Sequence, residues 1–324
     1  MEFRLIEHGV VDSTSERAFE TIAARTARHG DVHVATAQTS GRGRLGRAWH
    51  SAPGEGLYLS VILFPGPPPL SPPGLTMAAG LAVLDMVRGL GLATAQLKWP
   101  NDVVVPPRIG GSRAGGGSGG FAVAGDVEAR SSAAASPSDS PLQPASSREA
   151  AAPRDSDLPR AVEAPGEGLA DSTTSERAAK LSGVLVETRG LDPEAPHYVV
   201  GIGINVAQRQ FPPALESERP VTSLALCGLD VRVERVRDEL LAHLGRRLDS
   251  IRAAPAQLCA DFLAAAQLAG ARVRVAVGDA TIEGELLGLA LDEGLRIRLD
   301  DGRVQRVAIE FVRELQVEAH SSRG

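Results

Sequence analysis

A short glycine- and arginine-rich segment is the first candidate for chemistry in this sequence. Residues 41–47 read GRGRLGR, so three glycines and three arginines fall within one short stretch. Glycine permits close backbone approach, and arginine offers a planar fork of donors that suits a phosphate or a carboxylate. The segment therefore indicates a mobile loop that closes over an anion, with a solvated basic loop as the alternative. The formal net charge of −6 argues against a nucleic-acid-binding arm.

Three further clusters contain residue types that bind ligands. Residues 98–102 read KWPND and place a cation, a large aromatic ring and a carboxylate around a turn. Residues 180–183 read KLSG and put a lysine at the mouth of a strand, which is also a common position for a strand-edge lysine. Residues 201–206 read GIGINV; glycines inside an apolar strand indicate close approach by a ligand or by another backbone. Trp49 and Trp99, the two tryptophans of an aromatic-poor chain, both lie in these clusters, which favours ligand contact.

Hydrophobic periodicity predicts alternating strands and helices that would position the clusters. Ser13 and Glu16 form a capping-box pattern at the start of a helix, for which Gly30 is the expected stop. Further helices are predicted at residues 74–91, 230–251 and 255–267. Strands are predicted at residues 32–38, 57–64 and 180–187, at residues 198–206, and on both sides of a turn at residues 100–102.

Two composition changes divide the chain. Residues 106–179 consist mostly of Gly, Ser, Ala, Pro and scattered charge, so we predict a disordered insert there. Residues 271–318 contain short strand patterns separated by Gly/Asp turns, which predict a small all-β barrel. The sequence thus predicts an α/β domain of catalytic size over residues 1–268, interrupted at about residues 106–179, and a small C-terminal β-barrel domain over residues 269–318.

The remaining composition favours a cytoplasmic enzyme. Cys227 and Cys259 are the two cysteines, which suits a reducing compartment without a disulfide framework. No apolar run approaches the roughly 20 residues that span a bilayer, and the Cys and His positions show no metal-ligand spacing. We therefore expect no membrane partner, no nucleic acid and no protein-held metal.

Taken together and in order, the clusters resemble the motifs of the biotin protein ligases. Those enzymes share an STN motif, a GRGRxGRxW loop, KWPND, KxxGILxE and GIGxN. The matching positions here are residues 13–15, 41–49, 98–102, 180–187 and 201–205. The resemblance covers essentially all of the chain outside the insert. It implies an α+β catalytic domain, built as a mixed sheet with flanking helices as in the biotin/lipoate ligases, and an SH3-like C-terminal barrel.

The resemblance also implies a reaction and roles for residues. Biotin and ATP would give biotinyl-5′-AMP and pyrophosphate, and the biotinyl group would then pass to a lysine of a biotin carboxyl carrier domain. Mg²⁺ would enter with the nucleotide phosphates. The implied catalytic residues are Lys180, Arg42, Arg44 and Asp102, the last orienting or deprotonating the attacking lysine. The implied substrate-binding residues are Ser13, Thr14, Ser15, Gln38, Arg42, Gly43, Arg44, Lys180, Gly183, Gly203 and Asn205. Trp49, beside the adenine, and Asn101 are the implied ATP contacts, and the glycine/arginine loop would be a lid over the adenylate.

The sequence departs from the family pattern in four places. Ser15 replaces the usual asparagine, and Leu45 replaces an arginine that is common in the loop. Ile309 precedes Glu310 where the family often has glycine, and the insert separates two strands that usually lie a few residues apart. From that adjacency we predict that residues 103–105 pair antiparallel with the strand that begins near Lys180.

Three other functions remain as alternatives. A lipoate-type ligase would have the same fold, although the complete GRGRLGRAW loop favours biotin. A biotin-sensing repressor would carry a DNA-binding domain before the DST motif, which begins at Asp12, so we expect no room for one. A non-catalytic scaffold would not need Lys180, Arg42 and Arg44. A homodimer is a possible assembly.

Overall fold

The computed structural model describes residues 1–107, 178–190, 192 and 194–318. The predicted disordered insert lies outside the described residues except for its first two and last two positions. The last of these, Ala179, begins a strand, one residue before the start that the sequence predicts for it.

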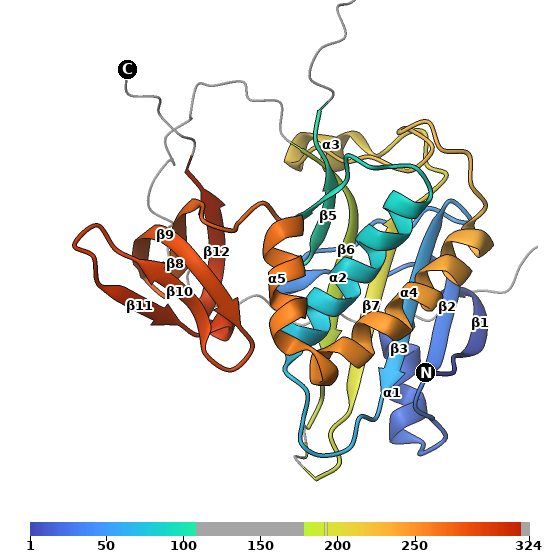
Figure 1. Cartoon of the computed structure of the whole chain (residues 1–324). Helices are drawn as coiled ribbons and strands as arrows, with labels where there is room; N and C mark the ends of the chain where they lie inside the picture. The colour runs from blue at the N-terminus through green and yellow to red at the C-terminus, as the bar shows by residue number, and fades with distance from the viewer. Residues whose placement is uncertain (108–177, 191, 193, 319–324) are drawn as a thin grey trace, which may run out of the picture. The chain divides into compact units, whose positions relative to one another are not determined.

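A seven-stranded mixed sheet is the centre of the first part of the fold (Figure 1). Its strand order is β1-β2-β3-β7-β6-β5-β4. The β1–β2 pair is parallel, and every other neighbouring pair is antiparallel. The strands are β1 (Arg4–Val11), β2 (Asp31–Gln38), β3 (Gly56–Leu63), β4 (Gln96–Lys98), β5 (Asp102–Val105), β6 (Ala179–Glu187) and β7 (Tyr198–Asn205).

Helices cover both faces of this sheet. On one face, α2 (Pro72–Gly89) packs on α4 (Val233–Ala253) and α5 (Pro255–Ala265), and Val61 of β3 belongs to their shared core. On the other face, α1 (Thr14–Ala23) forms a separate apolar cluster with Ile62, the next residue of β3. Because successive strand side chains point to opposite faces, these neighbours fix the two-sided arrangement. A short helix, α3 (Pro213–Glu218), was not predicted.

The hairpin across the insert confirms the predicted pairing. Strands β5 and β6 are antiparallel, with Asp102 opposite Gly183 and Val105 opposite Ala179. The register shifts between Val103 and Val104, so an irregularity lies between the second and third residues of β5. The pairing brings the KWPND turn and the KLSG strand to one edge of the site.

The C-terminal strands form a second sheet. Its order is β11-β10-β9-β8-β12, with every neighbouring pair antiparallel, and Val273, Leu286 and Ile297 lie in its core. Its edge strands β11 and β12 do not pair in the described chain, so the five strands form an open sheet and the predicted barrel closure is not seen. The boundary at residue 268 stays a prediction. The strands are β8 (Arg272–Val277), β9 (Ala280–Ala290), β10 (Gly294–Arg298), β11 (Val304–Val307) and β12 (Val312–Val317).

The start of the chain contains the clearest errors of prediction. Strand β1 was missed because only three of its eight positions are partly buried, so its apolar pattern is weak. The predicted capping box does not form: Ser13 is the N-cap of α1, but its side chain makes no capping bond, and Glu16 instead binds arginines. Helix α1 ends at Ala23 rather than near Gly30, because Arg25 adopts φ 57.

Candidate active site

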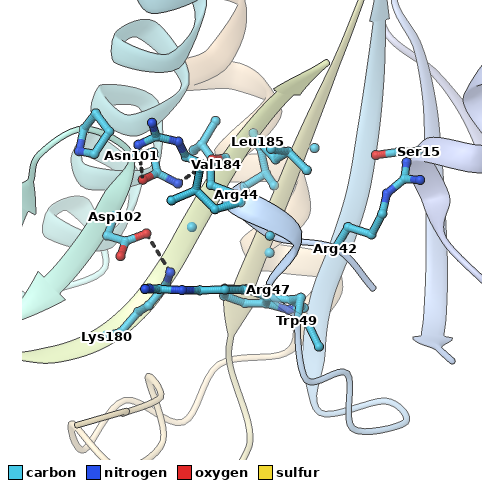
Figure 2. Close-up of a pocket in the computed structure, with 18 of the residues that line it drawn as sticks. Ser15, Arg42, Arg44, Arg47, Trp49, Asn101, Asp102, Lys180, Val184 and Leu185 are labelled. Atoms are coloured by element: carbon cyan, nitrogen blue, oxygen red, sulfur yellow. Dashed lines mark hydrogen bonds and ion pairs between the residues drawn. The ribbon is translucent and has the colours of Figure 1, made fainter. Parts of the chain in front are cut away.

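One cavity of about 420 Å³ gathers nearly all the residues that the motifs indicated (Figure 2). Its walls come from the start of α1, the end of β2, the glycine/arginine loop, β3, the KWPND turn, β6 and β7. The predicted residues that line it are Ser13, Thr14, Ser15, Gln38, Arg42, Gly43, Arg44, Trp49, Asn101, Asp102, Lys180, Gly183 and Gly203. Segments that are far apart in sequence therefore meet at one site.

Asn205 is the exception among the predicted substrate-binding residues. It lies outside the cavity lining, and its Nδ2 donates to the carbonyl oxygen of Thr222 at 2.9 Å. The backbone N–H of Thr222 in turn donates to the carbonyl oxygen of Lys180. Asn205 therefore holds the segment that runs beside Lys180, and its predicted role in substrate binding stays a prediction.

A cluster of neutral hydrogen-bonding groups forms one end of the cavity. Gln38 Oε1 accepts from the Thr14 backbone N–H at 2.8 Å and from Thr14 Oγ1 at 3.1 Å. The hydroxyl of Ser60 lies 2.8 Å from Thr14 Oγ1 and 3.0 Å from Ser15 Oγ, so the three hydroxyls form a chain. Ser60 was not singled out from the sequence, although it is the only serine in the apolar run of residues 57–64. This end offers donors and acceptors without a charge.

Lys180 and Asp102 form an ion pair in the middle of the site. Lys180 Nζ lies 2.7 Å from Asp102 Oδ1, and the lysine side chain is 14 % exposed. Burial lowers the pKa of Lys180, and the neighbouring Asp102 carboxylate counteracts that effect. The β5–β6 pairing brings the two side chains together from opposite ends of the insert. The pair keeps an ammonium group fixed inside the cavity.

The glycine/arginine loop is a tight hairpin in this structure. Arg42 and Ala48 form an antiparallel bridge, and the Trp49 backbone N–H donates to the Gly41 carbonyl oxygen at 2.9 Å. A Cβ at Gly41 would lie 2.8 Å from the Trp49 carbonyl oxygen, so glycine is required there. Leu45, in a 3₁₀ turn (Arg44–Gly46), adopts φ 56 and is 86 % exposed at the tip. Whether this hairpin opens and closes as a lid stays a prediction.

Arg42 is already paired with two carboxylates. Its guanidinium binds Glu16 of α1 and lies 3.1 Å from Glu187 of β6. Glu16 also accepts from Arg189 at 3.0 Å, and the hydrogen bonds from Arg189 and Arg42 lower the pKa of Glu16 to about 2. Arg189 in turn stacks over Phe19, 4.1 Å from the ring centroid. In Figure 2, Arg42 points toward Ser15 and away from Lys180. Its contacts tie the loop to α1 and β6.

Arg44, unlike Arg42, is directed toward the KWPND turn. Its Nη1 lies 3.5 Å from Asn101 Oδ1, and burial lowers its pKa. Asn101 Nδ2 donates to the Val184 carbonyl oxygen at 2.7 Å, which holds the turn against β6 (Figure 2). Arg44 therefore brings a guanidinium and Asn101 an amide to the same side of the cavity.

The cavity is strongly basic. Seven arginine and lysine residues line it against two carboxylates, Asp102 and Glu314. Arg219 was missed because no motif surrounds it. The residue after it, Pro220, accepts a hydrogen bond at its carbonyl oxygen from the backbone N–H of Lys180 at 2.9 Å. The charge of Arg219 contributes to the lowered pKa of Lys180. Such an excess of cations suits a polyanionic ligand.

The described residues do not provide a metal cage. No group of three or more His, Cys, Asp or Glu side chains in that part of the chain is arranged to hold a metal ion. Asp102, one of the two carboxylates of the cavity, is paired with Lys180. The described helices also include none that is long and apolar enough to cross a membrane.

Solved structures define the class of fold. The biotin protein ligase from Aquifex aeolicus in complex with biotin and ATP aligns with a TM-score of 0.62 and 23 % identity, over 97 % of this chain and 99 % of that one. The present chain therefore has the α+β fold of that protein, with a C-terminal β-sheet.

Sequence comparisons point to one family over part of the chain. A model of the biotin/lipoate A/B protein ligase family matches residues 8–122. The bifunctional ligase/repressor BirA of Bacillus subtilis is 41 % identical over 101 residues, which is 31 % of this chain and 31 % of that protein. The match thus spans about a third of that relative's length. The biotin–[acetyl-CoA-carboxylase] ligase of Mycobacterium tuberculosis is 27 % identical over 292 residues, 87 % of this chain and 79 % of that protein.

Proposed function

We propose that this protein is an ATP-dependent biotin ligase that forms biotinyl-5′-AMP and transfers the biotinyl group to a lysine of a biotin carboxyl carrier domain. One observation carries the proposal: a neutral hydrogen-bonding end and a strongly basic middle are continuous in one cavity of about 420 Å³. A neutral ureido ring and a carboxylate that must meet a polyphosphate need this combination.

The first step joins two anions. A biotin carboxylate oxygen attacks the α-phosphorus of ATP, and the bond from that phosphorus to the pyrophosphate oxygen breaks. Each pair of like charges about 4 Å apart costs roughly 4 kcal/mol at an effective dielectric of about 20. Lys180 and Arg44 are the cations that we assign to this position, since Arg42 is engaged by Glu16 and Glu187. Fixed charges stabilise most where charge develops in the transition state.

Other residues of the cavity lining supply the remaining binding groups. Ser13, Thr14 and Gln38 supply neutral donors and acceptors for the ureido ring. Trp49 offers an aromatic surface for adenine, and Asn101, which also lines the cavity, offers an amide. We assign these roles from the chemistry of the side chains.

The second step passes the acyl group to the carrier. The lysine amine of the carrier attacks the acyl carbon of the adenylate, and AMP leaves with the bond electrons. Asp102 is the carboxylate that we assign to orient this amine and receive its proton, while Lys180 stays beside the departing phosphate. A closed glycine/arginine loop would exclude water from the adenylate until the carrier domain binds.

Magnesium has no dedicated cage in the described residues, so we assign none of them to it. Mg²⁺ that accompanies ATP is usually held through phosphate oxygens and water. The steps above are therefore assigned to side chains of the chain itself.

Incubation of the full chain with ATP, a carrier domain and either biotin or lipoate tests the proposal. Mass spectrometry of the carrier should show a single biotinyl addition at one lysine, and biotin should support exchange of labelled pyrophosphate into ATP. Addition of lipoate alone would assign the chain to the lipoate branch of the family. Absence of both products with an acceptor that a known ligase modifies would reject a ligase function.

A further inference from the structure

Two glycines on neighbouring strands leave a bare patch on the floor of the cavity. Gly183 of β6 and Gly203 of β7 are direct partners in the antiparallel register. Directly opposed residues project to the same side of a sheet, and both of these line the cavity. The sheet is therefore without Cβ atoms at two adjacent points.

The indole of Trp49 lies on this patch. A Cβ at Gly203 would be 2.7 Å from Trp49 Cζ2 and 2.8 Å from Nε1, and nearer still to Cε2, the atom bonded to both. Nearly equal distances to the two flanking atoms mean that the added carbon would press on the face of the ring. A Cβ at Gly183 would be 3.1 Å from Cζ3, across the six-membered ring from Cε2. The indole thus spans the two strands with one face against the backbone.

The same patch places Lys180 relative to the ring. Lys180 Nζ lies 5.4 Å from the centroid of the Trp49 ring, and a Cβ at Gly183 would be 3.2 Å from that nitrogen. Any side chain at Gly183 would therefore crowd both groups at once. A cation at this distance from an aromatic face is weakly attracted to it.

We propose that Gly183 and Gly203 are positioning residues, which form a flat seat that holds the Trp49 indole against the sheet and leaves its opposite face for the base of a purine nucleotide. The sequence suggested that these glycines touch the substrate; in this proposal they act through Trp49. The nucleotide half of the inference rests on the proposed function, whereas the seat itself is a property of the chain without ligand.

Tryptophan fluorescence tests the seat directly, because the chain has two tryptophans. Trp99→Phe leaves Trp49 as the sole indole and retains an aromatic ring beside Phe262, with which Trp99 makes an edge contact. In this background, Gly203→Ala should shift Trp49 emission to longer wavelength and increase quenching by acrylamide, since the ring must leave the sheet. Gly183→Ala should act in the same direction but less, because its closest contact is longer.

Gly201→Ala is the matched control. It lies two residues away on the same strand, and its Cβ would approach Ser15 Oγ at 3.3 Å instead of Trp49. We expect unchanged Trp49 emission in this variant. Circular dichroism confirms folding in each case, and Gly183→Ala carries the test if Gly203→Ala does not fold. Equal emission in the parent and in the folded seat variants would overturn the proposal.

A titration with a non-hydrolysable ATP analogue in the presence of biotin tests the second half. Stacking of the base should quench Trp49, and Gly203→Ala should raise the Kd about tenfold, the order expected for loss of base stacking. Binding of the analogue without quenching of Trp49 would overturn the platform role even if biotin transfer succeeds. Failure of the parent chain to transfer biotin or lipoate would instead refute the proposed function, with the ligand-free emission still reporting on the seat.

Discussion

Replacing Glu16 by glutamine tests how the glycine/arginine loop is fastened. Glu16 joins Arg42 of the loop to Arg189 after β6, while Glu187 provides Arg42 with a second partner. The glutamine keeps the size of the side chain and removes its charge. Arg42 would then have Glu187 as its one remaining carboxylate partner, and Arg189 would lose its ion pair with Glu16.

The expected magnitude follows from the perturbed carboxyl. Its pKa falls from about 4.5 to about 2 in the folded chain, and each pKa unit corresponds to about 1.4 kcal/mol. The full difference therefore corresponds to about 3 kcal/mol as an upper value. Glu16 is 28 % exposed, so solvent screening brings the expected loss of unfolding free energy to about 1–2 kcal/mol at neutral pH.

The sign of the pH dependence is fixed by the direction of the shift. A carboxyl whose folded pKa is depressed stabilises the folded state above its unfolded pKa, and the contribution is lost as pH falls through the folded pKa. The difference in unfolding free energy between the parent and Glu16→Gln should therefore be full above about pH 4.5 and shrink between about pH 4.5 and pH 2. Urea unfolding at pH 7, 4 and 3 measures this difference.

Hydrogen exchange follows the loop itself. Amides of residues 41–49 should exchange faster in Glu16→Gln, since one of the two carboxylates on Arg42 is gone. Glu20→Gln is the control, because Glu20 lies on the same helix and its ion pair among the described residues is with Arg17; it should change stability by less than about 0.5 kcal/mol. An unfolding free energy and loop exchange in Glu16→Gln that match those of Glu20→Gln would refute this account of the loop.

Three other changes probe the proposed chemistry and the insert. Lys180→Ala should lower adenylate formation by about 10²–10³, because a positioned cation is lost; near-normal biotin-dependent pyrophosphate exchange would contradict the assignment. Arg44→Ser should leave stability nearly unchanged and release more adenylate, seen as biotinylation of bystander lysines; release equal to that of the parent would count against a lid. Replacing residues 108–177 by Asp-Gly should preserve folding and adenylation, because the β5–β6 register is already set up to Val105 and Ala179; a chain that unfolds would show that the segment belongs to the folded domain.

The sequence by itself determined most of the local structure. Alternation and helical spacing located β2, β3, β7, α2 and α4 within a few residues, because these patterns arise from the backbone periods of single elements. The motifs also indicated thirteen of the residues that line the cavity. Local patterns are weaker where an element is mostly exposed, which is why β1 was missed.

Tertiary structure decided what those side chains do. Arg42 appeared to be a free cation in the sequence, yet Glu187, which is 145 positions away, and Glu16 occupy its guanidinium. Ser60 and Arg219 line the cavity although no motif contains them. Asn205 belongs to a motif but does not line the cavity. Ion pairs and close contacts depend on strand register and on which segments meet across the sheet. Those relations form between residues that are distant in sequence, so no local period encodes them.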